Sequence, residues 1–195
     1  MDKAELRKRY LAKRKQLSPV EINDLNTALV ARFAQIKLEG IGVVHVFYPI
    51  PGKIEPDSLR IVNYLREEHP GIRLVLPKSN LDMHTLTHIL WTEDTPLAMN
   101  RWGITEPEQG EAVDPQSIDL VLIPLLAYDT HGNRVGYGKG FYDRFLASCR
   151  PGVVKAGISW FPPEELVTDA DPFDVPLDLC IHPKRVIYFR RGNLL

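Results

Sequence analysis

Three features are scarce in this sequence, and each shortage argues against a class of protein. Only two cysteines occur, Cys149 and Cys180, and neither belongs to a metal-ligand pattern, so we expect reduced thiols and no disulfide framework. No apolar run approaches the ~20 residues of a membrane-spanning helix, and the charged first residues lack the apolar core of a signal peptide. The formal net charge is only -1, which gives no field for nucleic acid or a membrane surface. We therefore predict a cytoplasmic protein that binds neither.

The remaining composition is that of a globular domain. The 195 residues are 44% hydrophobic and 25% charged, so we expect one domain over residues 1–195, as a monomer or a weak homodimer. The order of apolar periodicities is strand, helix, strand, which is typical of parallel strands joined by crossovers. We thus predict an α/β fold with a mainly parallel sheet flanked by helices. The predicted strands are 42–48, 72–77, 83–91 (an edge strand), 120–127, 153–160, 179–181 and 185–189. One helix is predicted over residues 3–16, three more begin near residues 18, 57 and 141, and a short one begins near residue 163.

The first predicted helix, residues 3–16, is strongly cationic. Leu6 and Tyr10 lie on one side, and most of the lysines and arginines should form a solvated face. Lys3 and Arg7 are the exception to consider, because residues four apart lie together on a helix.

The most informative stretch is residues 119–149, where an apolar strand leads through a polar turn into alternating glycines and then a helix. The glycines are Gly136, Gly138 and Gly140. A glycine loop that opens a helix places backbone N–H groups and a helix N-terminus against a phosphate group. The sequence therefore predicts a phosphate-binding loop here.

Charged residues in and after this loop favour the same interpretation. Arg134 and Lys139 supply cations for phosphate oxygens, and Asp143 lies in the first turn of the helix, where a carboxylate can hold Mg²⁺. The common nucleotide motifs are absent: Asn133 stands where a Walker A loop begins with glycine, and Phe141 occupies the last glycine position of a Rossmann loop. A glycine turn that merely lets the strand meet the helix remains the simpler alternative.

The run AYDTHGNRVGYGKGFYDRFL closely resembles the signature of the 5-formyltetrahydrofolate cyclo-ligase (5,10-methenyltetrahydrofolate synthetase) family. The resemblance implies a three-layer α/β/α topology shared with sugar-phosphate isomerases and CoA transferases. It also implies an ATP-dependent ligase that converts 5-formyltetrahydrofolate, with or without a polyglutamate tail, to 5,10-methenyltetrahydrofolate and releases ADP and phosphate. The positions that match the signature are Gly132, Arg134, Gly136, Gly138, Gly140, Tyr142, Asp143 and Leu146.

The same resemblance implies roles for individual residues. Arg134 and Lys139 would be catalytic, and Asp143 and Asp178 would bind magnesium, although Asp178 can equally be a turn or capping residue. ATP would contact the first helix and the glycine loop, at Lys3, Arg7, Arg134, Val135, Gly136, Tyr137, Gly138, Lys139, Gly140, Phe141 and Tyr142. The folate substrate would contact Arg7, Tyr48, Lys53, Glu55, Trp102, Tyr137, Gly138, Gly140 and Phe141.

One position departs from the family pattern. The family usually has an acid, which binds the pterin, where this chain has Lys53. An ammonium has no acceptor for the pterin N–H groups, so either Glu55 takes over, since i and i+2 share a side of an extended segment, or the substrate differs. Trp102, in a stretch of residues 100–110 expected to be loop, is either a hydrophobic plug or a stacking platform, and Glu106 lies near it in the sequence.

Two other functions stay open at this point. One is an ATP-dependent enzyme of the same scaffold that acts on a related formamide or carboxylate. The other is a non-catalytic folate- or nucleotide-binding regulator, associated with RNA through the basic first helix. RNA binding would weaken steeply with salt, and the complete set of loop cations and acids favours catalysis.

Overall fold

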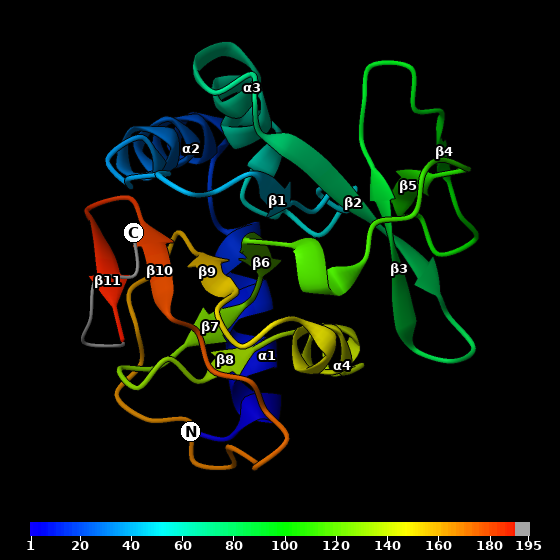
Figure 1. Ribbon diagram of the computed structural model, residues 1–195. Coiled ribbons are helices and arrows are strands. Elements are labelled where there is room, and N and C mark those ends of the chain that lie inside the picture. Colours follow the sequence, from blue (N-terminus) through cyan, green and yellow to red (C-terminus); the bar gives the residue numbers. More distant parts are fainter. Residues whose placement is uncertain (190–195) are drawn as a thin grey trace.

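The computed structural model describes residues 1–189, and a single seven-stranded sheet forms its centre (Figure 1). The strand order is β11-β10-β9-β6-β1-β2-β3. The five inner strands pair in parallel, whereas β3 and β11 pair antiparallel at the two edges. The strands are β1 Val43–His45, β2 Arg73–Asn80, β3 Thr85–Leu90, β4 Leu97–Met99, β5 Thr105–Pro107, β6 Leu120–Pro124, β7 Ala127–Tyr128, β8 Arg134–Val135, β9 Val154–Ile158, β10 Leu179–His182 and β11 Arg185–Tyr188.

Helices cover both faces of this sheet, which confirms the predicted α/β fold. Helices α2 (Pro19–Phe33) and α3 (Ser58–Glu68) lie on one face, and α4 (Phe141–Ser148) lies on the other (Figure 1). The residues of β6 alternate between the two cores: Leu120 and Leu122 pack toward α2 and α3, and Val121 and Ile123 pack toward α4. A strand that is apolar on both sides therefore becomes the middle of the sheet.

The first helix, α1 (Lys3–Lys15), packs elsewhere. Leu6 and Tyr10 contact Val135 and other residues of the small β7–β8 sheet, which forms a third apolar cluster. A capping box, in which Asp2 and Glu5 each accept a backbone N–H of the other, begins the helix. This packing sets α1 directly against the segment that contains the glycine loop.

Two sequence predictions about local structure were wrong. The stretch 100–110 is not all loop, because β5 pairs antiparallel with β4 in a separate two-stranded sheet. Residues Pro163–Leu166 form no helix; instead Glu164 bridges to Asp129, and the Thr130 N–H donates to the Glu164 carbonyl at 3.0 Å. Among residues 1–189, no helix combines the length and the apolar character needed to cross a membrane.

Candidate active site

The turn that precedes the glycine loop is organised by one buried carboxylate, Asp129. Its Oδ1 accepts the backbone N–H groups of His131 and Asn133, each at 2.9 Å, and its Oδ2 accepts the N–H of Val167 at 3.0 Å. Gly132 in this turn has φ 86°, and a Cβ there would lie 2.9 Å from the Leu177 carbonyl oxygen. These contacts fix the conformation of the polar turn, and the turn sets the direction of β8 and of the loop after it.

The glycine loop then runs from Gly136 to Gly140 and opens α4. Gly138 and Gly140 adopt left-handed backbone conformations, with φ of 86° and 69°, which side chains rarely allow. Gly140 is the N-cap of α4, and no side chain caps the helix there. An uncapped helix N-terminus after a glycine loop presents backbone donors to an anion, as the sequence predicted.

Helix α1 lies directly on this loop. The Arg7 Nε donates to the Gly136 carbonyl at 2.9 Å, and a Cβ on Gly138 would lie 3.1 Å from the Arg7 guanidinium carbon. One helical turn earlier, Lys3 forms an ion pair with Asp174. The structure therefore brings the two cations selected from the first helix to the glycine loop and to the segment after β9.

Arg134 is nearly buried beside the loop, with 7% of its surface exposed. It forms an ion pair with Asp143 at 2.6 Å and donates to the Val175 carbonyl. Burial lowers the pKa of the guanidinium, while Asp143 and then Asp174 act in the opposite direction. Asp143 also accepts the Val175 N–H at 3.2 Å, so two partly exposed carboxylates, Asp143 and Asp174, flank one arginine.

Asp178, the second acid predicted to bind magnesium, lies deeper in the protein than Asp143. Its side chain is fully buried, accepts the Lys155 backbone N–H at 2.9 Å and forms an ion pair with the Lys155 ammonium at 2.7 Å. A carboxylate held this way inside the sheet is a structural partner for a buried lysine. Asp174, four residues earlier, forms its ion pair with Lys3 and acts on Arg134 only through its charge.

The loop that follows β1 meets the glycine loop through one hydrogen bond. The Tyr137 hydroxyl donates to Glu55 Oε1 at 2.6 Å, and Glu55 Oε2 accepts the Ile50 N–H at 2.7 Å. Glu55 is buried, whereas Lys53 is exposed and its ammonium lies 5.8 Å from the centre of the Tyr137 ring. The carboxylate that contacts the glycine loop is therefore that of Glu55, and Lys53 contributes only an exposed ammonium. Tyr48, half-buried, packs near the Trp91 ring at 6.3 Å.

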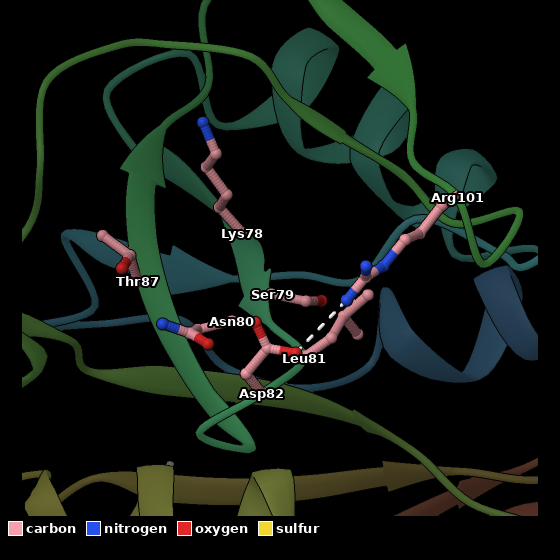
Figure 2. Close-up of a pocket in the computed structure, with 7 residues that line it drawn as sticks. All are labelled: Lys78, Ser79, Asn80, Leu81, Asp82, Thr87 and Arg101. Carbon is pink, nitrogen blue, oxygen red and sulfur yellow. Dashed lines mark hydrogen bonds and ion pairs between the residues drawn. The ribbon is translucent and has the colours of Figure 1, made fainter.

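The loop between β4 and β5 carries Trp102, which is 58% exposed. Glu106, in contrast, is buried and accepts the Ser79 N–H at 2.8 Å, so it holds β5 against β2. A shallow pocket of about 370 Å³ lies beside these strands, and Figure 2 shows Arg101 reaching across it to Asp82 at 3.2 Å. The β2–β3 turn contacts α4, because the ring centres of His84 in the turn and Phe141 in the helix are 5.6 Å apart.

Sequence reasoning missed one residue of this region, Arg14. It is 3% exposed, and its guanidinium donates to the Leu125 carbonyl at 2.7 Å and to the Tyr137 hydroxyl at 3.1 Å. The signal was present, because Leu6, Tyr10 and Arg14 follow at intervals of four on the buried side of α1.

Comparison with known proteins agrees with this arrangement. The model of the 5-formyltetrahydrofolate cyclo-ligase family matches residues 1–180. The 5-formyltetrahydrofolate cyclo-ligase of Mycoplasma pneumoniae is 31% identical over 189 residues, covering 93% of this chain and 99% of the relative. That of Haemophilus influenzae is 26% identical over 137 residues, covering 69% and 72%.

Solved structures give the same result. The structure of Aquifex aeolicus 5,10-methenyltetrahydrofolate synthetase superposes with a TM-score of 0.82 at 30% sequence identity, covering 100% of this chain and 96% of that one. A 5,10-methenyltetrahydrofolate synthetase from Mycoplasma pneumoniae gives 0.74 at 30% identity, covering 93% and 98%. The resemblance seen in the glycine-loop signature is thus confirmed over the whole fold, and the chain belongs to the 5-formyltetrahydrofolate cyclo-ligase family.

Proposed function

We propose that this protein converts 5-formyltetrahydrofolate to 5,10-methenyltetrahydrofolate at the expense of ATP, with release of ADP and phosphate. The observation that carries the proposal is the 2.6 Å hydrogen bond between Tyr137 and Glu55. Tyr137 belongs to the loop with the phosphate-binding geometry, and Glu55 is the buried acceptor on the loop after β1. Tyr137 thus joins the proposed phosphate site to the proposed aminopyrimidine site. The reaction requires both, because ATP and the folate must bind side by side.

The chemistry explains why both sites are needed. The formyl carbonyl is a poor electrophile, and its oxygen is a very poor leaving group. Transfer of a phosphoryl group to that oxygen converts it into a phosphate. The neighbouring folate nitrogen then forms a bond to the formyl carbon, and the carbon–oxygen bond breaks as phosphate leaves. Such a transfer needs positioning and charge stabilisation from the protein rather than a nucleophilic side chain.

The residues around the glycine loop suit that positioning task. Arg7 lies on the loop and Lys139 is exposed within it, so both can reach phosphate oxygens together with the N–H groups that open α4. Arg134 is fixed by Asp143 and by the Val175 carbonyl, so its charge is preorganised and needs no rearrangement in the transition state. We assign the catalytic role to Arg134 and Lys139. We assign ATP contacts to Lys3, Arg7, Val135, Gly136, Tyr137, Gly138, Gly140, Phe141 and Tyr142.

The acids beside Arg134 fit Mg²⁺. Asp143 and Asp174 have side chains that are 31% and 21% exposed; Asp143 pairs with Arg134, and Asp174 pairs with Lys3. No group of three or more metal-binding side chains occurs within residues 1–189, which agrees with an ion held by one or two carboxylates and substrate phosphates. When bound, Mg²⁺ supplies positive charge to the phosphate oxygens. We therefore propose Asp143 and Asp174 as its protein ligands.

For the folate, we propose Glu55 as the acceptor of the pterin N–H groups in place of the usual acid, with Lys53 beside it at the entrance. Arg7 on the glycine loop and Phe141 at the start of α4 are further proposed contacts, and Trp102 provides an exposed ring. Tyr48 stands at the end of β1, on the segment that leads to Glu55. The exposed ammonium of Lys53 is suited to a carboxylate of the substrate's glutamate tail rather than to its pterin.

The test is turnover of defined substrates. Purified protein with Mg²⁺, ATP and 5-formyltetrahydrofolate should form the methenyl chromophore and ADP in equal amounts. Arg134→Gln should lower kcat about 100-fold or more, since one preorganised donor to transition-state charge is worth that much. Arg73→Gln is the matched control, because Arg73 is an exposed arginine at the opposite, amino end of β2 that pairs only with Glu111.

Two outcomes would contradict the proposal. If neither product forms over a range of pH and metal concentration, the cyclo-ligase activity is absent. If ADP forms without the chromophore, phosphoryl transfer goes to water or to an oxygen that does not lead to ring closure, and formylfolate is not the substrate.

A further inference from the structure

Arg14 is a buried cation with no assigned role in the proposed reaction. It lies in the last turn of α1 and is only 3% exposed. Its guanidinium donates to the Leu125 carbonyl at 2.7 Å, to the Tyr137 hydroxyl at 3.1 Å and, at 3.5 Å, to the Lys53 carbonyl. Among the described residues it makes no ion pair with a carboxylate, although a buried charge is costly unless it is compensated.

The compensating carboxylate is reached through Tyr137. The tyrosine oxygen accepts from Arg14, and its O–H donates to Glu55 at 2.6 Å. Cation, phenol and carboxylate thus form a chain of two hydrogen bonds in a region of little exposure, where such bonds strengthen one another. Burial and then the Glu55 charge raise the pKa of the Tyr137 hydroxyl, while Arg14 lowers it. The phenol therefore stays protonated and keeps its donor directed at Glu55.

The loop that holds Glu55 needs such support. Ile54 has φ 49°, and a β-branched residue in the left-handed region is strained by about 1–2 kcal/mol. Gly52, two residues earlier, has φ 77°. The contacts that oppose this strain are those of Glu55 with Ile50 and Tyr137, and of Arg14 with the Lys53 carbonyl. Arg14 thus contacts the strained loop both directly and through Tyr137.

We propose that Arg14 is a positioning residue that fixes Glu55 through Tyr137 and so sets the affinity of the folate subsite. The proposal rests on the proposed function for its substrate. Arg14 links three segments that are distant in the sequence: the end of α1, the loop after β1 and the glycine loop.

The test compares Arg14→Met, Tyr137→Phe and the double variant, with Arg32→Met as control. Arg32 also donates to a backbone carbonyl, that of Pro183 at 3.3 Å, but on α2. Arg14→Met and Tyr137→Phe should each raise the KM for 5-formyltetrahydrofolate about tenfold, as expected for one lost charged hydrogen bond. For Arg14→Met, which changes no residue assigned to ATP, the KM for ATP and kcat should change little. The double variant should be no worse than the poorer single variant, because both interrupt the same chain of hydrogen bonds.

A purely structural role predicts a different pattern. Effects that add in the double variant, or that fall on kcat and on the KM for ATP as strongly as on the folate, would overturn the proposal. Tyr137→Phe keeps the shape of the side chain, so it tests the chain of hydrogen bonds even if Arg14→Met fails to fold. A double-mutant cycle on urea unfolding of the ligand-free protein separates this idea from the proposed function. Coupling between Arg14 and Tyr137 supports the connection even if formylfolate is not the substrate, and its absence refutes the connection.

Discussion

Lowering the pH from 7 to 5 should destabilise the fold through two buried histidines, His45 on β1 and His88 on β3. Their exposed fractions are 0% and 4%, and their rings are 5.2 Å apart. Both pack on Phe145 of α4, at 4.6 Å and 4.0 Å between ring centres. Neither nitrogen of His45 nor Nδ1 of His88 has a hydrogen-bond partner among the described residues. The site favours two neutral imidazoles.

The magnitude follows from the pKa of each imidazole. Burial lowers the pKa of His88 to about 4, and burial together with the neighbouring His88 lowers that of His45 well below its usual range. An unfolded histidine titrates near pH ~6.5, so below this pH the unfolded chain binds protons that the folded protein does not. Stability is therefore complete above pH ~6.5 and falls as the pH drops toward 4. At pH 5 the loss is about 2 kcal/mol for each histidine.

Urea unfolding at pH 7 and pH 5 measures this loss. Between these values carboxylates, which titrate near pH ~4, contribute little. Replacement of both histidines in His45→Leu/His88→Leu should remove most of the difference between the two pH values, whatever it does to absolute stability. The control His131→Leu changes an exposed histidine and should keep the difference. If the double variant loses as much stability between pH 7 and pH 5 as the native protein, the reasoning is refuted.

Two further substitutions test the glycine loop and the buried ion pair. Gly138→Ala should cost about 1 kcal/mol or more in urea unfolding, because φ is 86° and the Cβ meets Arg7, whereas Gly136→Ala, with nothing within 4 Å, should cost less; equal costs would contradict this. Asp178→Asn should cost roughly 3–5 kcal/mol by leaving Lys155 unpaired, and Asp178→Leu/Lys155→Met should recover most of it. Unchanged stability with a raised magnesium requirement for turnover would instead make Asp178 a metal ligand.

Local signals in the sequence predicted the parts of the fold that depend on local chemistry. The helices predicted from residues 18 and 57 are α2 and α3; the Ser18–Glu21 capping box begins the first, and the N-cap Asp57 begins the second. The glycine loop and α4 also follow from the order of their residues. A partner that lies far away in the chain could not be predicted: Asp178 pairs with Lys155 of β9, which is 23 residues earlier. Spacing alone does not reveal such a pairing.

Arg14 illustrates a different reason. The density of lysine and arginine in α1 predicted a solvated face, and that is correct for Lys8, Arg9 and Lys15, which are exposed. Arg14 differs because it shares the side of the helix defined by Leu6 and Tyr10, and that side packs on the β7–β8 sheet. Charge composition described the helix as a whole, whereas periodicity would have separated this one cation from the others.

The two ends of the site are therefore specified by different kinds of residue. The phosphate end depends on backbone geometry, so the glycines and Arg134 must occur at fixed spacing and appear as a signature. The folate end depends on which side chain can reach an acceptor across two loops, and several solutions satisfy that requirement. Here Lys53 replaces the usual acid, and Glu55 is held at the glycine loop by Tyr137 and Arg14 instead. If the proposed function is correct, Tyr137 belongs to both ends, and its hydrogen bonds to Glu55 and Arg14 tie the folate loop to the glycine loop.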